Sequence, residues 1–223
     1  MPLKKSAKPR GRVLIVDDHP MMREGLAQLI EHEPDLVVES QADSAAQALG
    51  IIETSVPDLL LLDISLPDKN GLEVIKDVRA LHPSLPILVV SMHDESLYAE
   101  RVLRAGGRGY IMKQEGGKRL MQAIRHVLEG RIYVSEKISA RILETFSGRG
   151  GDTQSPIENL SDREFEVFQL LGQGRGTREI SVHLHISIKT VEVHRTNIRK
   201  KLALSTGGEL VHYAIRWHES QRP

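Results

Sequence analysis

The chain has 223 residues, 40% of them hydrophobic and 27% charged, which is an ordinary composition for a globular protein of one or two domains. Its 30 Lys and Arg residues balance its 30 Asp and Glu residues, so any binding of nucleic acid must depend on a local cluster of charge. The lack of cysteine excludes disulfides, thiolate catalysis and cysteine-ligated metals. With no long apolar run and no signal-peptide pattern, we expect a cytoplasmic protein with no membrane partner.

Residues 12–130 alternate between short apolar runs and amphipathic segments. The apolar runs, in chain order, are RVLIVDD, DLVVESQAD, PDLLLLD, PILVVSM and GYIMK. A helical pattern follows each run, and Ser44 is expected to cap the second helix. Repeated βα units of this length predict an α/β domain with a doubly wound, five-stranded parallel sheet.

The sequence changes character after residue 146. Residues 147–159, SGRGGDTQSPIEN, are rich in Gly, Ser and Pro and indicate a linker. Beyond them four amphipathic segments predict a small all-α domain. We therefore expect an α/β domain at 12–130, a connecting helix and linker at 131–159, and a helical domain at 160–219.

Acidic residues end two of the expected strands. Asp17 and Asp18 follow the first apolar run, and Asp63 follows the third. Open α/β sheets place ligands at the carboxyl ends of their strands, and Mg²⁺ would relieve the repulsion among clustered carboxylates. Ser91 and Lys113, at the ends of the fourth and fifth strands, would add a hydroxyl and an ammonium. Single aspartates at strand ends are often turn formers, but together these residues predict a site for a phosphoryl group.

The stretches VDDHP, DISLPDKNG, VVSM and GYIMK resemble the receiver domain of two-component response regulators, which has a flavodoxin-like fold. The resemblance implies that Asp63 accepts a phosphoryl group and becomes an aspartyl phosphate. The implied Mg²⁺ ligands are the side chains of Asp17, Asp18 and Asp63 and the backbone carbonyl of Ser65, with Asp17 acting mainly through water.

The same resemblance assigns a switch. Lys113 would pair with phosphate oxygens, Ser91 would swing toward the phosphate, and Tyr110 would move inward behind it. Ser65 and His93, each two residues past a position of the site, are expected to set the lifetime of the phosphate.

The second half of the chain contains a basic helix. Two helices around a turn near residues 185–187 are predicted by the stretch TREISVHLHISIKTVEVHRTNIRKKL. Residues 189–201 contain five Lys or Arg residues and only one Glu. Such a helix can enter a major groove and grip phosphates. LSDREFEVFQLLGQG, REIS and SIKTVEVHRTNIRKKL resemble the LuxR-type helix-turn-helix of NarL/FixJ-type response regulators.

This second resemblance implies that Glu192, Val193 and Thr196 face base edges. The other residues expected in the DNA-binding set are Lys189, Thr190, His194, Asn197, Lys200 and Lys201. Glu192 is unusual because a lysine often stands there. A carboxylate can accept a hydrogen bond from a cytosine amino group, but it also repels phosphates.

Together these features predict a phosphorylation-controlled, DNA-binding transcription regulator that is not an enzyme beyond accepting its own phosphoryl group. Its expected partners are a sensor histidine kinase or small phosphodonor, promoter half-sites and, after phosphorylation, a second copy of the chain. The sequence leaves open whether the receiver masks the recognition helix. A Mg²⁺-dependent phosphatase of the haloacid-dehalogenase type and a protein-binding adaptor are the alternatives.

Overall fold

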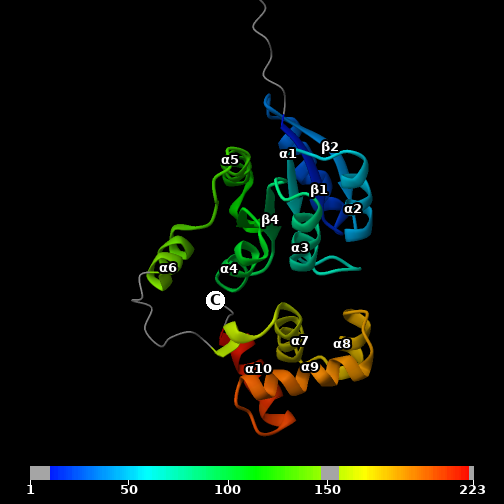
Figure 1. The fold of residues 1–223 in the computed structure, drawn as a ribbon, viewed down its shortest axis with the longest axis vertical. Coiled ribbons are helices and arrows are strands. Elements are labelled where there is room, and N and C mark those ends of the chain that lie inside the picture. The colour runs from blue at the N-terminus through cyan, green and yellow to red at the C-terminus, as the bar shows by residue number, and fades with distance from the viewer. Residues whose placement is uncertain (1–10, 147–155, 221–223) are drawn as a thin grey trace, which may run out of the picture. The chain divides into compact units, whose positions relative to one another are not determined.

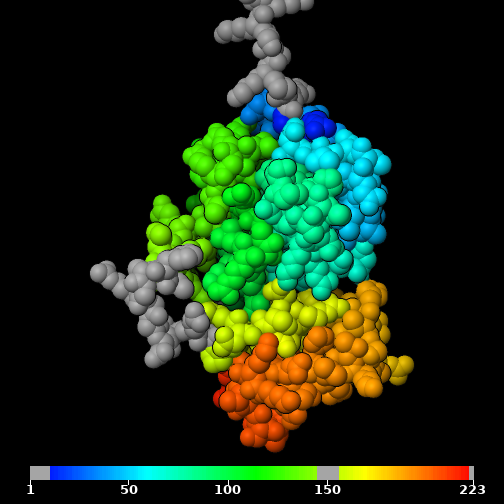
Figure 2. All heavy atoms as spheres, in the orientation of Figure 1, coloured from blue at the N-terminus to red at the C-terminus, as the bar shows by residue number. Residues whose placement is uncertain are grey.

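The computed structural model describes residues 11–146 and 156–220. The chain divides after Phe146 into two compact units, drawn as ribbons in Figure 1 and as atoms in Figure 2. Most of the predicted linker lies outside the described residues. No helix in the described ranges is long and apolar enough to cross a membrane.

The first unit has the predicted α/β fold, with a five-stranded parallel sheet in the order β2-β1-β3-β4-β5. The strands are β1 (Gly11–Val16), β2 (Leu36–Ala42), β3 (Leu59–Leu62), β4 (Ile87–Ser91) and β5 (Gly109–Met112). The helices are α1 (Pro20–Glu31), α2 (Ala45–Thr54), α3 (Gly71–Leu81), α4 (Glu95–Ala105) and α5 (Gly117–Leu128), with a 3₁₀ turn, η1 (Lys113–Glu115), before α5.

The four leucines of β3 are buried on both faces of the sheet. Leu59 and Leu61 belong to a core that also contains Ile30 of α1 and Ile124 of α5. The alternate residues of the strand face the other side, where α3 contacts both α2 and α4 (Figure 1). Burying a leucine side chain contributes about 2 kcal/mol, which explains why so short a strand is uninterruptedly apolar.

The segment after α5 closes one edge of the sheet. Tyr133 bridges Gly109 in a parallel arrangement, so β5 is not an open edge strand. The chain then forms α6 (Glu136–Phe146), which contacts α4. Ile138 of α6 is 3% exposed, and the Ser135 amide donates to Glu95 Oε1 at 2.7 Å.

The second unit is the predicted all-α domain. It consists of η2 (Pro156–Asn159), α7 (Asp162–Gly172), α8 (Thr177–His183), α9 (Ile188–Lys201) and α10 (Gly207–Ser220). The rings of Phe165 and Phe168 on α7 pack against Trp217 of α10. The turn between α8 and α9 has His185 at φ 52°, and the Ser187 side chain caps α9 by accepting from the Thr190 amide at 3.0 Å.

The amino end of α2 is capped from a distant loop. Asp68 accepts from the backbone amides of Ala45 and Ala46, each at 2.9 Å. Ser44 occupies the N-cap position but makes no side-chain capping bond, so the expectation that Ser44 caps this helix is wrong. A carboxylate accepts two amides at once and favours the positive end of the helix dipole. Partial burial alone would raise the pKa of Asp68, but the hydrogen bonds from backbone amides have the larger effect, so the pKa lies below 3.8.

We therefore expect Asp68→Ala to lower the free energy of unfolding of the first unit by about 1 kcal/mol, the usual worth of a helix cap. The matched control is Ser44→Ala, which should stay within about 0.5 kcal/mol of wild type. Because the pKa of Asp68 is lowered by folding, its contribution is present above pH 3.8 and is lost as pH falls through the folded pKa. Denaturant titrations at neutral and acid pH measure both effects, and equal losses for the two variants would contradict this assignment.

Candidate functional site: an acidic pocket and a basic helix

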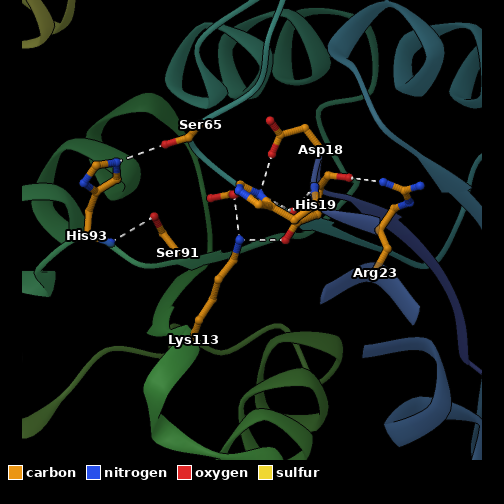
Figure 3. Close-up of polar contacts among 9 residues, drawn as sticks. Asp18, His19, Arg23, Ser65, Ser91, His93 and Lys113 are labelled. Carbon is orange, nitrogen blue, oxygen red and sulfur yellow. Dashed lines mark hydrogen bonds and ion pairs between the residues drawn. The ribbon is translucent and has the colours of Figure 1, made fainter. Parts of the chain in front are cut away.

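The acidic pocket lies at the carboxyl ends of β1 and β3. These strands are adjacent and parallel, with Val16 opposite Leu62, so the aspartates that follow them emerge side by side. Asp17 and Asp63 are 1% and 3% exposed, and Asp18 is half-buried beside them. The structure thus brings together the three carboxylates that the sequence predicts. Figure 3 shows Asp18 at this site, with Lys113 nearby.

Lys113 supplies the positive charge of the pocket. Its Nζ lies 2.7 Å from Asp17 Oδ2 and 2.7 Å from Asp63 Oδ2, and its side chain is only 3% exposed. Burial raises the pKa of Asp63, the Lys113 ammonium opposes that effect, and Asp17 adds to it. Burial by itself lowers the pKa of Lys113, but the two carboxylates outweigh it and raise that pKa above 10.5.

His19 also lies in the pocket, which the sequence analysis missed. Its Nδ1 lies 2.6 Å from Asp18 Oδ1 and 3.3 Å from Asp17 Oδ1, and its backbone amide donates to Asp17 Oδ1 at 2.9 Å. The signal available in the sequence was its position directly after the two acids in VDDHP. Figure 3 shows its ring beside Asp18.

The donor set of the pocket fits a divalent cation. Asp17, Asp18, His19 and Asp63 each offer a ligand atom, and these atoms lie within 4.8 Å of one another. Asp63 Oδ1 is buried and has no hydrogen-bond partner among the described residues. Carboxylate oxygens are the ligands that Mg²⁺ prefers, so the residues present suit that ion.

A second group of side chains lines the pocket at the end of β4. Ser91 is fully buried and its Oγ accepts from the His93 amide at 3.3 Å. The His93 ring forms a hydrogen bond with Ser65 Oγ at 3.0 Å. The backbone carbonyl of His93 accepts from the Tyr110 hydroxyl at 2.8 Å. Burial lowers the pKa of His93 and raises that of Tyr110, so burial favours the neutral form of both side chains. Ser65, Ser91 and Tyr110 therefore form one connected network around His93.

The loop after Asp63 is fixed independently of any ligand. A side chain at Gly71 would place its Cβ 2.7 Å from the Asp63 carbonyl oxygen, so only glycine fits there. The Asn70 side chain caps α3 by accepting from the Leu72 amide at 2.7 Å. The start of α3 is thus held directly behind Asp63.

Between two exposed lysines, helix α9 has a face that carries acidic, apolar and polar side chains. Val193 is 51% exposed and the Glu192 side chain 54% exposed, while the Thr196 hydroxyl donates to the Glu192 carbonyl at 2.9 Å. Lys189 and Lys200 are exposed toward the two ends of the helix. The predicted residues Thr190, His194 and Asn197 are half-buried. This face therefore has a lysine near each end and, between the two lysines, the side chains of Glu192, Val193 and Thr196.

Two basic residues of α9 are engaged inside the unit instead. Lys201 Nζ bonds to Glu164 Oε2 of α7 at 2.6 Å, which anchors the end of α9. Arg195 lies 3.3 Å from Glu192 Oε1 and also donates to the Thr177 hydroxyl. These partners were not visible in the sequence because they come from other helices or depend on side-chain conformation.

Two family models match the chain. Residues 13–125 match the response regulator receiver domain, and residues 158–214 match the bacterial regulatory proteins of the luxR family. The oxygen regulatory protein NreC of Staphylococcus aureus is 34% identical over 210 residues, which cover 92% of this chain and 97% of that protein.

Solved structures of response regulators also resemble this chain. A LuxR-family two-component response regulator from Aurantimonas sp. SI85-9A1 is 34% identical with a TM-score of 0.57, covering 62% of this chain and 99% of that one. RcsB from Salmonella enterica serovar Typhimurium, bound to promoter P1flhDC with the phosphomimetic BeF3−, is 26% identical with a TM-score of 0.65. That match covers 92% of this chain and 98% of the RcsB chain.

The chain therefore belongs to the NarL/FixJ-type response regulators, which combine a receiver domain with a LuxR-type DNA-binding domain. It is a phosphorylation-controlled transcription regulator and not an enzyme. Membership in this family decides against both the phosphatase and the adaptor. Receiver domains generally bind Mg²⁺ at an acidic pocket, and this chain has such a cluster of aspartates.

Lys113→Met tests the electrostatics of the pocket. Removing the ammonium leaves two buried carboxylates without their counter-charge, so we expect the free energy of unfolding to fall by about 3 kcal/mol in the presence of a chelator. Excess Mg²⁺ should restore part of that loss, because it supplies positive charge to the same oxygens. Lys118→Met, at an exposed position on α5, is the control. Equal stability of Lys113→Met and Lys118→Met in a chelator would refute this account.

Proposed function

We propose that Asp63 is the phosphoryl acceptor of this regulator and that its phosphorylation controls DNA binding by the second unit. The observation that carries the proposal is the buried Asp63 carboxylate at the end of β3, paired with Lys113 and adjacent to Asp17. The donor would be a sensor histidine kinase or a small acyl phosphate. Because the target is DNA, we expect the protein to act in the cytoplasm.

The chemistry follows from the residues of the pocket. An Asp63 oxygen attacks the phosphorus, a new oxygen–phosphorus bond forms, and the bond to the donor breaks with its electrons leaving on the donor. Bound Mg²⁺ would neutralise the carboxylates and the phosphoryl oxygens, with Asp18, Asp63 and the Ser65 carbonyl as its ligands and Asp17 acting through water. The Lys113 ammonium would move from the carboxylates to a phosphoryl oxygen, where it stabilises developing negative charge.

The switch would act through the network around His93. A phosphoryl oxygen would draw the Ser91 hydroxyl toward it, and Ser91 already contacts the His93 amide. The Ser65–His93 hydrogen bond joins the loops after β3 and β4, so its persistence would affect water access and therefore phosphate lifetime. The Tyr110 side chain already points inward and donates to the His93 carbonyl, so phosphorylation would require only a small movement of Tyr110.

DNA binding is proposed for the exposed face of α9. Lys189 and Lys200 would grip phosphates on either side of the base-facing residues Glu192, Val193 and Thr196. Lys201 is held by Glu164, so we assign it to the anchoring of α9 within the unit. Two copies, paired after phosphorylation, would occupy two promoter half-sites.

Asp63→Asn should abolish incorporation of phosphate from acetyl phosphate, because an amide cannot act as the nucleophile. Incorporation into wild type should also stop when a chelator removes Mg²⁺. Intact-mass spectrometry, followed by release of the phosphate with hydroxylamine, measures the acyl phosphate. Asp77→Asn, on the half-exposed surface of α3, is the control and should retain incorporation. Phosphate on Asp63→Asn at the wild-type level would refute the acceptor assignment.

Lys200→Ala should weaken binding to all duplexes to a similar extent, because a phosphate contact carries no sequence information. The slope of log affinity against log salt should become shallower by about 1. Fluorescence anisotropy over a range of salt concentrations gives both quantities. Lys118→Ala in the receiver domain should leave them unchanged. A loss confined to one sequence would contradict a phosphate contact at Lys200.

A further inference from the structure

The Glu192 carboxylate on α9 is held by two partners, which together with it we name the Glu192 clamp. Glu192 Oε1 accepts from the Thr177 hydroxyl at 2.9 Å and from Arg195 Nη1 at 3.3 Å. Arg195 in turn donates to the Thr177 hydroxyl. The three side chains thus form a closed set of hydrogen bonds between the first residue of α8 and the middle of α9.

The clamp orients the carboxylate in advance of binding. A glutamate on an exposed helix face ordinarily samples several rotamers, and ordering it on binding costs free energy. Here Oε1 is fixed, while Oε2 has no hydrogen-bond partner within the described part of the chain. The Glu192 side chain is 54% exposed, whereas Arg195 is 21% exposed. The clamp therefore leaves one acceptor oxygen available on a largely exposed side chain, while its cation is mostly buried.

The clamp also reduces the electrostatic repulsion between the Glu192 carboxylate and the phosphates of DNA. A carboxylate close to the duplex is repelled by the phosphates, but Arg195 supplies an opposite charge 3.3 Å away. Lys189 and Lys200 lie exposed toward the two ends of the same helix, where they can hold the backbone. The acid is thus compatible with a groove-facing position, provided that a hydrogen-bond donor meets it there.

We propose that Glu192 determines sequence specificity by accepting a hydrogen bond from the amino group of a cytosine in the major groove, with Thr177 and Arg195 as positioning residues. Cytosine presents only its amino donor there, whereas adenine presents an acceptor nitrogen beside its amino group, which repels a carboxylate. Guanine and thymine present acceptors at that edge. This inference rests on the proposed DNA binding by α9.

The test is selection of duplexes from a random pool by the full-length, phosphorylated protein. Wild type should enrich duplexes with a cytosine at one position of each half-site. Glu192→Ala should reduce the affinity ratio of cytosine over the other bases at that position about tenfold and leave the other positions unchanged. Glu192→Gln offers both an acceptor and a donor, so it should move the preference at that position to adenine.

Paired variants at Thr177 separate positioning from folding. Thr177→Ser keeps the hydroxyl and should retain the cytosine preference, whereas Thr177→Val lacks it and should reduce the preference at the same position. Titrations of duplexes that differ only at that position measure the ratio, and circular dichroism confirms that each variant is folded. A Thr177→Val protein with the wild-type ratio overturns the positioning role.

Two other outcomes have distinct meanings. If wild type enriches a sequence and both Glu192 variants enrich the same one, the inference is overturned while the proposed DNA binding stands. If wild type enriches no duplex and retards none at low salt, the proposed function itself fails, and the inference fails with it.

Discussion

The ion pairs of Lys113 with Asp17 and Asp63 are the interaction on which the receiver domain depends. Two carboxylates this deeply buried repel each other, and burial raises the pKa of Asp63. The order of the sheet nevertheless places them side by side, because β1 and β3 are neighbours. One ammonium 2.7 Å from each carboxylate offsets that repulsion. The same arrangement makes the pocket receptive to further positive charge, since Asp63 Oδ1 still has no hydrogen-bond partner among the described residues.

The surrounding loops hold this charged centre in place. Gly71 lies against the Asp63 carbonyl, where no side chain fits, and Asn70 caps the helix that begins there. Asp68 reaches across to cap α2. The stretch PDKNG after the third strand therefore fixes the loop to two helices at once. A carboxylate held this firmly needs little reorganisation when a charged group binds beside it, and such preorganisation is the condition for strong electrostatic stabilisation.

The sequence predicted the parts of the site that follow from strand order, and it missed those that depend on side-chain conformation. The positions of Asp63 and Lys113 follow from their places at strand ends, since parallel strands share one carboxyl edge. The cap supplied by Asp68 is separated from α2 by 23 residues along the chain, and local cap rules favoured Ser44. The partner of Lys201 and one of the two partners of Glu192, Thr177, likewise come from neighbouring helices, and a charge count over one helix contains no information about them.

The hydrogen bonds of the receiver domain also suggest how the pocket communicates with the rest of the chain. The segment after β4 contacts the pocket through Ser91 and His93. A few residues later it contacts α6, where Glu95 accepts from the Ser135 amide and Arg141 donates to a carbonyl in the first turn of α4 at 3.4 Å. Because one short segment bonds to both, the pocket and α6 are joined by a continuous set of contacts within residues 91–96. In the chain, α6 is the last helix of the first unit before the DNA-binding domain.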